Sequence, residues 1–238
     1  MTDKHGSECM VCGAALRYLA AEREQRCGYC GAALRSDACC EQGHFVCDAC
    51  HSRDGLQVIE QICRLSAETD MVALMDHIRG HGAIPDHGPE HHALVPAVIV
   101  TTYRNLGGTV DEQALATAIA RGSKVPGGFC GQSGGCGAAL GVGIGFSILL
   151  GASPVKAELR QQVQQITAKT LLALASQPAA RCCQRDGWTA LQEAAELSKS
   201  LLPIPLRAEA PLTCTQHQRN RFCLGESCAI HPAFPEEG

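Results

Sequence analysis

A chain of 238 residues can bury a sizeable hydrophobic core and exceeds the usual size of one compact domain, so we expect a main domain and a smaller module. The formal net charge of -4, the sequence pI near 6.2 and the scattered arginines argue against a nucleic-acid binder that relies on a basic face. With one Trp, three Tyr and five Phe, a base-stacking platform is also not expected.

Cysteine is the most informative residue type of the chain. The 16 cysteines follow a polar amino-terminal segment, Met1 to Glu8, that does not have the pattern of a signal peptide. We therefore expect thiols in a reducing cytoplasm, where such a density indicates metal binding or redox chemistry rather than disulfides. The longest apolar run, Ala138 to Ala152, is interrupted by glycines and is shorter than a membrane span, so we expect a buried helix and no membrane anchor.

Residues 1–55 predict a small finger module that binds two zinc ions. Three Cys-x-x-Cys pairs follow one another there, and each is typical of a turn in which two thiolates hold one metal ion. A further half-site comes from Cys39 or Cys40 with His44, while His51 could replace a neighbouring ligand. The expected ligands are Cys9, Cys12, Cys27, Cys30, Cys40, His44, Cys47 and Cys50.

Two pairings of these eight ligands are open. The sequential pairing groups them in chain order, as Cys9, Cys12, Cys27, Cys30 and then Cys40, His44, Cys47, Cys50. The interleaved pairing, which the spacing favours slightly, groups them as Cys9, Cys12, Cys40, His44 and then Cys27, Cys30, Cys47, Cys50. Closed four-ligand zinc sites usually stabilise a module too small to have a core of its own, so we expect a structural role, with partner docking as the alternative.

Residues 56–238 predict a mainly α-helical domain with an extended carboxy-terminal tail. Apolar spacing, caps and breakers indicate helices over residues 54–65, 69–79, 96–106, 113–122, 138–152, 154–177 and 188–202. We expect Thr109 to Glu112 to form a capping box and Ser153-Pro154 to open a long helix. The histidine-rich segment from His81 to His92 is expected to be a loop, in which His91 and His92 are candidate metal ligands or proton donors.

The glycine-rich segment from Pro126 to Gly151 is the expected centre of this domain. It contains Cys130 and also Cys136, which lies at a predicted helix start, where the helix dipole and free amides favour the thiolate. Three glycines spaced four residues apart would give that helix a bare face for a close neighbour, namely Gly137, Gly141 and Gly145. Alternation of apolar residues with glycine would also suit a strand. No Gly-Lys-Ser/Thr follows, so a phosphate-binding loop is not indicated.

The remaining cysteines of interest lie in the segment RCCQRD and in the proline-rich tail. Cys182 and Cys183 are flanked by arginines, and positive charge beside a thiol stabilises a thiolate or an anionic cluster. The tail cannot build a core, so its cysteines must be held by docking or ligation. With Cys130 and Cys136 these make seven thiols, enough for one iron–sulfur cluster and a redox-active pair, or for another zinc-type site, with buried structural cysteines as the alternative. The tail cysteines are Cys214, Cys223 and Cys228.

The chain as a whole resembles a domain-of-unknown-function family of cysteine-rich proteins, found mostly in anaerobic bacteria and methanogenic archaea. The motifs that carry this resemblance are CGYCG, GHFVCDACH, HGPEHH, YRN, RG, VPGGFCGQSGGCGAALGVGIGFS, RCCQRD and CTQHQRNRFCLGESC. The resemblance implies a partner, because similar domains are joined to radical-SAM or S-adenosylmethionine-dependent methyltransferase-like proteins. This chain contains neither the radical-SAM cysteine motif nor a methyltransferase glycine fingerprint, so it would act with such an enzyme in trans.

Residues 93–154 are also similar to the redox-associated family named for its C-GCAxxG-C-C cysteines. The shared pattern is a helix, a glycine-rich CG…CGAA loop and a second helix. Where that family begins with a cysteine, this chain has His91 and His92.

Together these observations predict a cytoplasmic redox or metal-cluster protein from an anaerobe, with two zinc ions and one iron–sulfur cluster. The cluster or dithiol chemistry would be carried by Cys130, Cys136, Cys182 and Cys183, and completed or covered by Cys214, Cys223 and Cys228. The negative charge of the cluster would be offset by Arg104, Arg121 and Arg185. The alternatives are a non-enzymatic, zinc-stabilised adaptor and a sulfur- or methyl-transfer enzyme with Cys136 as its nucleophile; the small-molecule substrate stays open.

Overall fold

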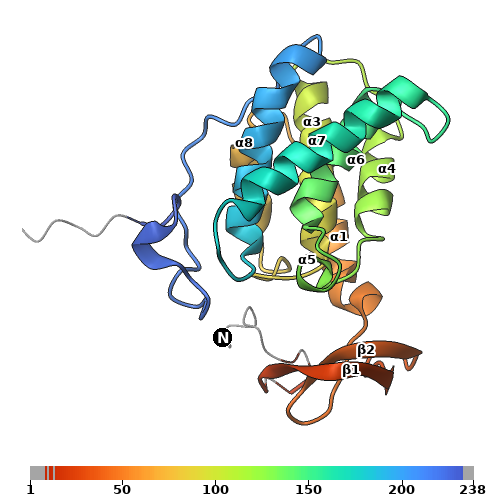
Figure 1. Cartoon of the computed structure of the whole chain (residues 1–238), viewed down its shortest axis with the longest axis vertical. Helices are drawn as coiled ribbons and strands as arrows, with labels where there is room; N and C mark the ends of the chain where they lie inside the picture. Colours follow the sequence, from red (N-terminus) through yellow and green to blue (C-terminus); the bar gives the residue numbers. More distant parts are fainter. Residues whose placement is uncertain (1–8, 10, 13, 233–238) are drawn as a thin grey trace, which may run out of the picture.

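A small β-hairpin and a helical bundle follow one another along the chain (Figure 1). The structure is a computed structural model that describes residues 9, 11, 12 and 14–232. Over these residues the strands are β1 (Leu16–Arg26) and β2 (Ala33–Cys40), and the helices are α1 (Asp48–Leu65), α2 (Met71–Arg79), α3 (Glu90–Asn105), α4 (Ala114–Gly122), α5 (Phe129–Gln132), α6 (Gly137–Leu149), α7 (Ala157–Ala175) and α8 (Cys183–Leu201). The expectation of a mainly helical chain is confirmed.

The finger module, residues 9–50 here, is a hairpin that leads directly into α1. Strand β1 pairs antiparallel with β2, from Leu16 opposite Cys40 to Arg26 opposite Ala33. Cys47 is the N-cap of α1, so this helix starts inside the module and ends in the bundle. The domain boundary expected at residue 55 therefore falls within a continuous helix.

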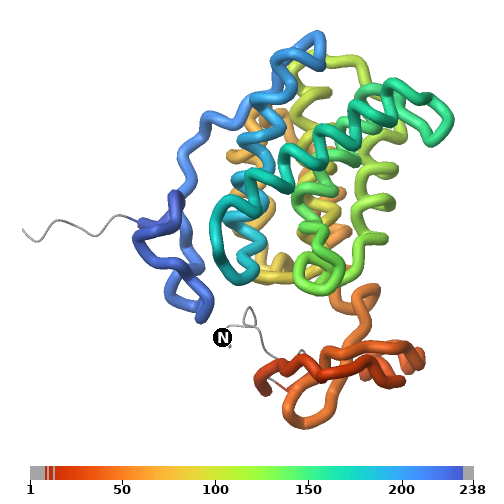
Figure 2. The backbone as a smooth tube through the Cα atoms, viewed as in Figure 1, coloured from red at the N-terminus to blue at the C-terminus, as the bar shows by residue number. Residues whose placement is uncertain are grey.

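Helix α3 is the centre of the bundle, because α1, α2, α4, α6 and α8 all pack against it. It is apolar on nearly every side, with fully buried residues such as Val98 and Ile99, as expected for a helix without a solvent face. Figure 2 shows that the chain leaves α8 and returns along the bundle as an extended tail. None of the helices in the described part of the chain has the length and apolar composition that a membrane crossing requires.

Helices α3 and α6 approach each other closely along the glycine face of α6. A Cβ atom on Gly141 would lie 2.9 Å from atoms of Val95 and Pro96, and one on Gly145 would lie 2.8 Å from Ile99 Cγ2. Such distances are too short for real side chains, so only glycine permits this packing. The expected bare helix face is confirmed, and the strand alternative for this segment is wrong.

The beginnings of several helices differ from the expected positions. Helix α3 begins at Glu90 and includes Pro96, so His91 and His92 lie in its first turn rather than in a loop. Proline cannot donate to the carbonyl four residues earlier, and that carbonyl, of His92, instead packs tightly against Gly122 at the end of α4.

Three further helices also begin at other positions than expected. Helix α4 begins after Gln113, whose amide donates to Asp111 Oδ1 over 2.7 Å, so the expected capping box does not form. Helix α7 begins after Lys156, because Ser153 and Pro154 belong to the preceding turn. Helix α8 begins at Cys183, earlier than expected, and Cys182 is its N-cap.

Candidate functional sites

The first metal site of the module is formed by the start of the described chain and the end of the hairpin. Cys9, Cys12, Cys40 and His44 place one potential ligand atom each within 4.8 Å of the others. Cys12 Sγ lies 3.9 Å from Cys40 Sγ and 3.2 Å from His44 Nδ1. Sulfur and nitrogen donors gathered at this spacing can hold a single metal ion.

The second metal site combines the hairpin turn with the start of α1. Its potential ligands are Cys27, Cys30, Cys47 and Cys50, again all within 4.8 Å, and the Sγ atoms of Cys30 and Cys47 are 3.8 Å apart. Both groups correspond to the interleaved pairing. Cys39 belongs to neither, since it is buried with its sulfur 3.8 Å from Nη2 of Arg23.

Backbone amides turn toward the sulfurs of both sites. The Val11 amide lies 3.4 Å from the sulfur of Cys9, and the Tyr29 amide lies 3.4 Å from the sulfur of Cys27. In each case the amide belongs to the residue two positions after the cysteine. Hydrogen bonds from the amides of Cys30 and Cys47 lower the pKa of Cys27 to about 6. The neighbouring thiols have the opposite effect on Cys50, whose pKa is raised to about 12. The three thiolates of the first site or the four of the second would repel one another at these distances, so a bound cation would stabilise each site.

The seven other candidate thiols do not converge on one place. Four of them, Cys182, Cys214, Cys223 and Cys228, line a small pocket between the start of α8 and the tail, which we call the tail pocket. The other three, Cys130, Cys136 and Cys183, line a cavity of about 510 Å³ between the module and the bundle, which we call the module–bundle cavity. The vicinal cysteines are divided between the two, because Cys182 caps α8 and Cys183 is its first residue.

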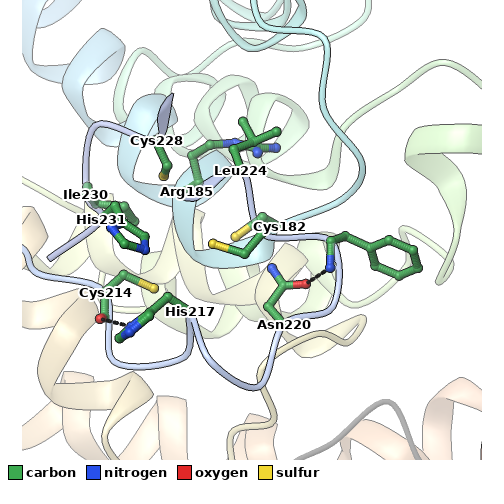
Figure 3. A pocket seen from close by; sticks show the side chains of 11 residues that line it. Cys182, Arg185, Cys214, His217, Asn220, Leu224, Cys228, Ile230 and His231 are labelled. Atoms are coloured by element: carbon green, nitrogen blue, oxygen red, sulfur yellow. Dashed lines mark hydrogen bonds between the residues drawn. The ribbon is translucent and has the colours of Figure 1, made fainter. Parts of the chain in front are cut away.

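The tail pocket repeats a feature of the module's metal sites. The amide of Gly225 donates to Cys223 Sγ over 3.4 Å, and the amide of Gln216 donates to the sulfur of Cys214, in each case from two residues further along the chain. In Figure 3 the side chains of Cys182, Cys214 and Cys228 surround the same pocket. The open space at its centre is about 10 Å³, and its four sulfurs do not all lie within 4.8 Å of one another.

Polar contacts attach the tail to the end of α2 and to the histidine-rich loop that follows it. Arg79 Nη2 donates to Gln216 Oε1 over 2.7 Å, and Arg219 forms a two-bond ion pair with Asp86. Within the tail, the amide of Cys214 donates to the Ile230 carbonyl over 2.7 Å. These contacts hold an extended, proline-rich segment in one place, as its composition requires.

Arg185 provides a positive charge at the tail pocket, but this charge is shared with a neighbouring carboxylate. Arg185 lines the pocket, but its guanidinium also pairs with Asp186 at 2.8 Å and donates to the Ala180 carbonyl. Burial raises the pKa of Cys182, and burial together with the neighbouring thiols raises the pKa of Cys214. Cys182 and Cys214 therefore favour the protonated thiol, and a bound cation would be needed to hold these two sulfurs as thiolates.

Polar contacts join the module and the first turn of α1 to the bundle around the module–bundle cavity. Asp48 Oδ2 accepts from the Gly127 amide over 2.8 Å, and Asp37 Oδ2 accepts from Gln132 Nε2 over 2.6 Å. In addition, Arg181 Nη1 donates to the Tyr18 hydroxyl over 2.9 Å, and His51 Nδ1 lies 3.4 Å from Glu90 Oε2. The loop that carries Cys130 is thus held against the module.

The two histidines at the start of α3 differ in their availability. His91 is buried, accepts from Arg79 Nη1 at Nδ1 (2.9 Å) and donates from Nε2 to the Pro85 carbonyl (2.8 Å). Burial and the Arg79 charge lower its pKa well below the usual value, so it is a neutral ring with both nitrogens engaged. His92 donates from Nδ1 to the Val125 carbonyl over 2.8 Å, which leaves Nε2 as an acceptor.

The expectation that Cys136 is a readily formed thiolate is wrong for the protein without a bound ligand. Cys136 is the N-cap of α6, as expected, and the nearby amides of Ala138 and Ala139 act to lower its pKa, although its side chain makes no cap hydrogen bond. Burial nevertheless outweighs the effect of these amides and, with the charge of Asp186, raises the pKa of Cys136 to about 11. Burial likewise raises the pKa of Cys183 to about 12, despite a hydrogen bond from the Gly88 amide.

Two of the arginines expected near a cluster lie elsewhere. Arg104 donates to the backbone carbonyls of Cys63 and Ser66, which fastens α3 to the end of α1, and Arg121 donates to Ser147 Oγ over 3.3 Å. Neither residue lines the tail pocket or the module–bundle cavity. Cys63 itself is fully buried and packs in the hydrophobic core.

Sequence reasoning missed several polar residues that surround these sites. Glu90 is fully buried between Gly55 and Gly88, and neither of its carboxylate oxygens has a hydrogen-bond partner among the described residues. Burial opposes the protonation of His51, but the Glu90 carboxylate, with Oε2 3.4 Å from His51 Nδ1, outweighs it and raises the pKa of His51. The motif HGPEHH contains Glu90, yet only the fold shows that this carboxylate lies behind the module–bundle cavity.

Comparison with known proteins covers the bundle and the tail. Residues 59–231 match the model of a protein family that is described as a family of unknown function (DUF5714). The match begins after both metal sites of the module, and it includes the tail pocket and the bundle side of the module–bundle cavity. No curated protein matches the chain, and no solved structure matches it either.

Proposed function

This chain belongs to the family of unknown function DUF5714, and we propose that it is a redox protein whose metal cluster is held in the tail pocket. The proposed ligands are Cys182, Cys214, Cys223 and Cys228. The observation that carries the proposal is the convergence of these four cysteines, from α8 and from three places in the tail, on one pocket. Buried cysteines that serve packing alone have no reason to gather in this way.

Hydrogen bonds to the sulfurs support ligation. Cys214 and Cys223 each accept an amide hydrogen bond from the residue two positions further on, as Cys9 and Cys27 do in the module. Such bonds stabilise thiolates, and they tune the potential of iron–sulfur clusters. The side chain of Gln216 is also placed 3.6 Å from the sulfur of Cys182.

The spacing of the sulfurs favours a cluster over a single ion. One ion draws its four ligands together, as in the module, whereas an iron–sulfur cluster places several metal atoms and sulfides between its cysteines. The sulfurs of the tail pocket are the more widely spaced set. Because the open space is only about 10 Å³, the extended tail would have to move outward when a cluster is inserted.

The finger module would bind two zinc ions in this proposal. Each of its sites has four protein ligands and no open position, which is the pattern of structural zinc. Bound zinc would then hold the module in a fixed conformation, in which its residues line one side of the module–bundle cavity.

The partner that we propose is a radical-SAM or other S-adenosylmethionine-dependent enzyme that acts in trans in an anaerobic cytoplasm. The support for it is the family resemblance of the motifs. Radical cleavage of S-adenosylmethionine consumes one electron, and a four-cysteine cluster transfers electrons singly. The many reduced cysteines fit a reducing compartment.

Metal analysis of anaerobically purified protein, reconstituted with iron and sulfide, tests the proposal. We expect bound iron, acid-labile sulfide and visible absorption that dithionite bleaches, all lost in Cys214→Ala and kept in the matched variant Cys63→Ala, which removes a buried cysteine outside every site. Zinc in the tail pocket, without iron or visible absorption, would contradict the cluster.

A non-enzymatic adaptor is the second candidate function. It is favoured by the closed four-ligand sites of the module, which stabilise structure without offering a reactive position. In that case Cys214→Ala would leave the binding of a partner enzyme unchanged in a pull-down experiment, whereas Cys47→Ala would abolish it.

A further inference from the structure

We propose that Cys136 and His92 form a nucleophilic site for an electrophilic small molecule in the module–bundle cavity. The site would take substrates in which a carbon atom carries a leaving group, such as alkyl or acyl donors. It uses none of the metal ligands of the module or the tail pocket, so it stands independently of the proposed cluster.

The cavity has the size and the walls of a small-molecule site. Its volume of about 510 Å³ lies within the usual range for ligand pockets, and both the module and the bundle contribute to its lining. Cys136 and His92 line it from α6 and α3, two helices that pack closely together. The nucleophile and the proton acceptor are therefore carried by rigid elements rather than by loops.

Cys136 is placed to form a stabilised thiolate during a reaction. It is the N-cap of α6 and precedes the first turn, where the free amides of Ala138 and Ala139 act to lower its pKa without forming a cap hydrogen bond in the resting protein. Because burial keeps the resting group protonated, an attack by sulfur requires that a base accept the proton.

His92 has the tautomer and the position of such a base. Its Nδ1–H donates to the Val125 carbonyl, so Nε2 carries the lone pair. The ring lies against the start of α6, and a Cβ on Gly137 would overlap it, lying 2.5 Å from Nε2. Gly137, the residue after the nucleophile, thus lets the imidazole reach the helix start. No direct hydrogen bond joins the two side chains among the described residues, so a substrate or a water molecule would lie between them.

The proposed step is a displacement at carbon. The sulfur of Cys136 forms a bond to the electrophilic carbon while its proton moves to His92 Nε2. The bond between that carbon and the leaving group breaks, and the electron pair departs with the leaving group. The Val125 carbonyl, which accepts from Nδ1–H, orients the ring and stabilises the imidazolium that forms.

Alkylation by iodoacetamide tests this pair in the full-length, metal-loaded protein. Peptide mass spectrometry gives the rate at Cys136, with the exposed Cys130 of the same loop as an internal reference. His92→Asn is the matched variant, because its side-chain amide can still donate to the Val125 carbonyl while the base is removed. We expect the rate at Cys136 to fall about tenfold or more and the rate at Cys130 to stay the same.

Gly137→Ala provides a second variant that keeps both reacting groups. Its methyl group would displace the His92 ring from the start of α6, so we expect the rate at Cys136 to fall here as well. Circular dichroism and metal content report whether each variant folds, and if His92→Asn does not fold, Gly137→Ala decides. Equal rates at Cys136 in the wild type and the folded variant would overturn the proposal, as would a wild type that reacts at Cys130 but not at Cys136.

Discussion

The module and the tail pocket use the same donor chemistry in different structural settings. In the module, the ligand atoms of each site lie within 4.8 Å of one another, and all of them come from the segment before β1, the hairpin, the loop after it and the start of α1. In the tail pocket, four cysteines line the same space at wider spacing, and they come from α8 and from a tail that crosses the bundle. Local turns therefore build the first kind of site, whereas only tertiary packing builds the second.

This difference implies opposite relations between metal and fold. The module has little apolar core of its own, so bound metal would supply the free energy that keeps it folded. The tail pocket is attached to a bundle that is already folded around α3, and metal there would fix only the tail. Variants and conditions that act on one region and spare the other should therefore distinguish the two.

Removal of metal should unfold the module and spare the bundle. Structural zinc sites contribute about 10 kcal/mol of binding free energy, more than a hairpin of this size can replace. We expect that a strong chelator, or Cys47→Ala, abolishes amide hydrogen-exchange protection in β1 and β2, while α3 stays protected. Loss of protection in α3 to the same extent would show that the bundle depends on the module.

Loss of one tail-pocket cysteine should release the tail without affecting the module. In Cys223→Ala the tail pocket would lose one of its four thiols and the amide bond from Gly225. We expect limited proteolysis to cleave near residues 215–230 at least tenfold faster, with unchanged metal content in the module. Cys63→Ala is the control, and equal cleavage of this variant would argue that core packing, not ligation, holds the tail.

Acidification should release metal from the tail pocket before it releases metal from the module. One thiol in each module site has a lowered pKa, about 6 for Cys27 and about 7 for Cys40, although the neighbouring thiols raise that of Cys50. The thiolates of Cys27 and Cys40 therefore persist as the pH falls from 9 and are lost only near pH 6 to 7. Burial instead raises the pKa of Cys182 and Cys214, so protons compete with metal there at higher pH. Metal content of the wild type and of Cys223→Ala, measured from pH 8 to pH 5, checks this order; release from the module first would contradict it.

Loss of one hydrogen bond between the module and the bundle should change the stability of the protein least. In Asp48→Asn the Gly127 amide loses a charged acceptor, which should destabilise the contact by about 1 kcal/mol. We expect faster hydrogen exchange in residues 126–133 and an unchanged midpoint of thermal unfolding for the bundle. Asp54→Asn, at an exposed position on α1, is the matched control.

Several features of the sites could be predicted from short stretches of sequence. Each Cys-x-x-Cys pair brings two thiols together through its own turn, so the module's ligands were identifiable without knowledge of the fold. The helix start at Cys136 and the glycine face of α6 follow from local caps and from helical periodicity. The spacing of the cysteines and His44 favoured the interleaved pairing of the ligands only slightly over the sequential pairing.

Other features depended on packing that no local pattern contains. Pro96 suggested a helix start, but the carbonyl that it leaves unbonded is accommodated against Gly122, so α3 continues back to Glu90. The expected thiolate at Cys136 followed from the helix dipole, whereas the depth of burial, which is a tertiary property, reverses the direction of its pKa.

The candidate metal ligands, the course of most helices and the bare face of α6 could be read from the amino-acid sequence, because these properties depend on neighbours within a few positions. Only the tertiary structure decided that Cys182 faces the tail while Cys183 faces the module, and that His92 keeps a free nitrogen while His91 does not. The physical reason is that ligand sets, burial and hydrogen-bond partners are set by segments that are distant in the chain and meet only when the core is packed.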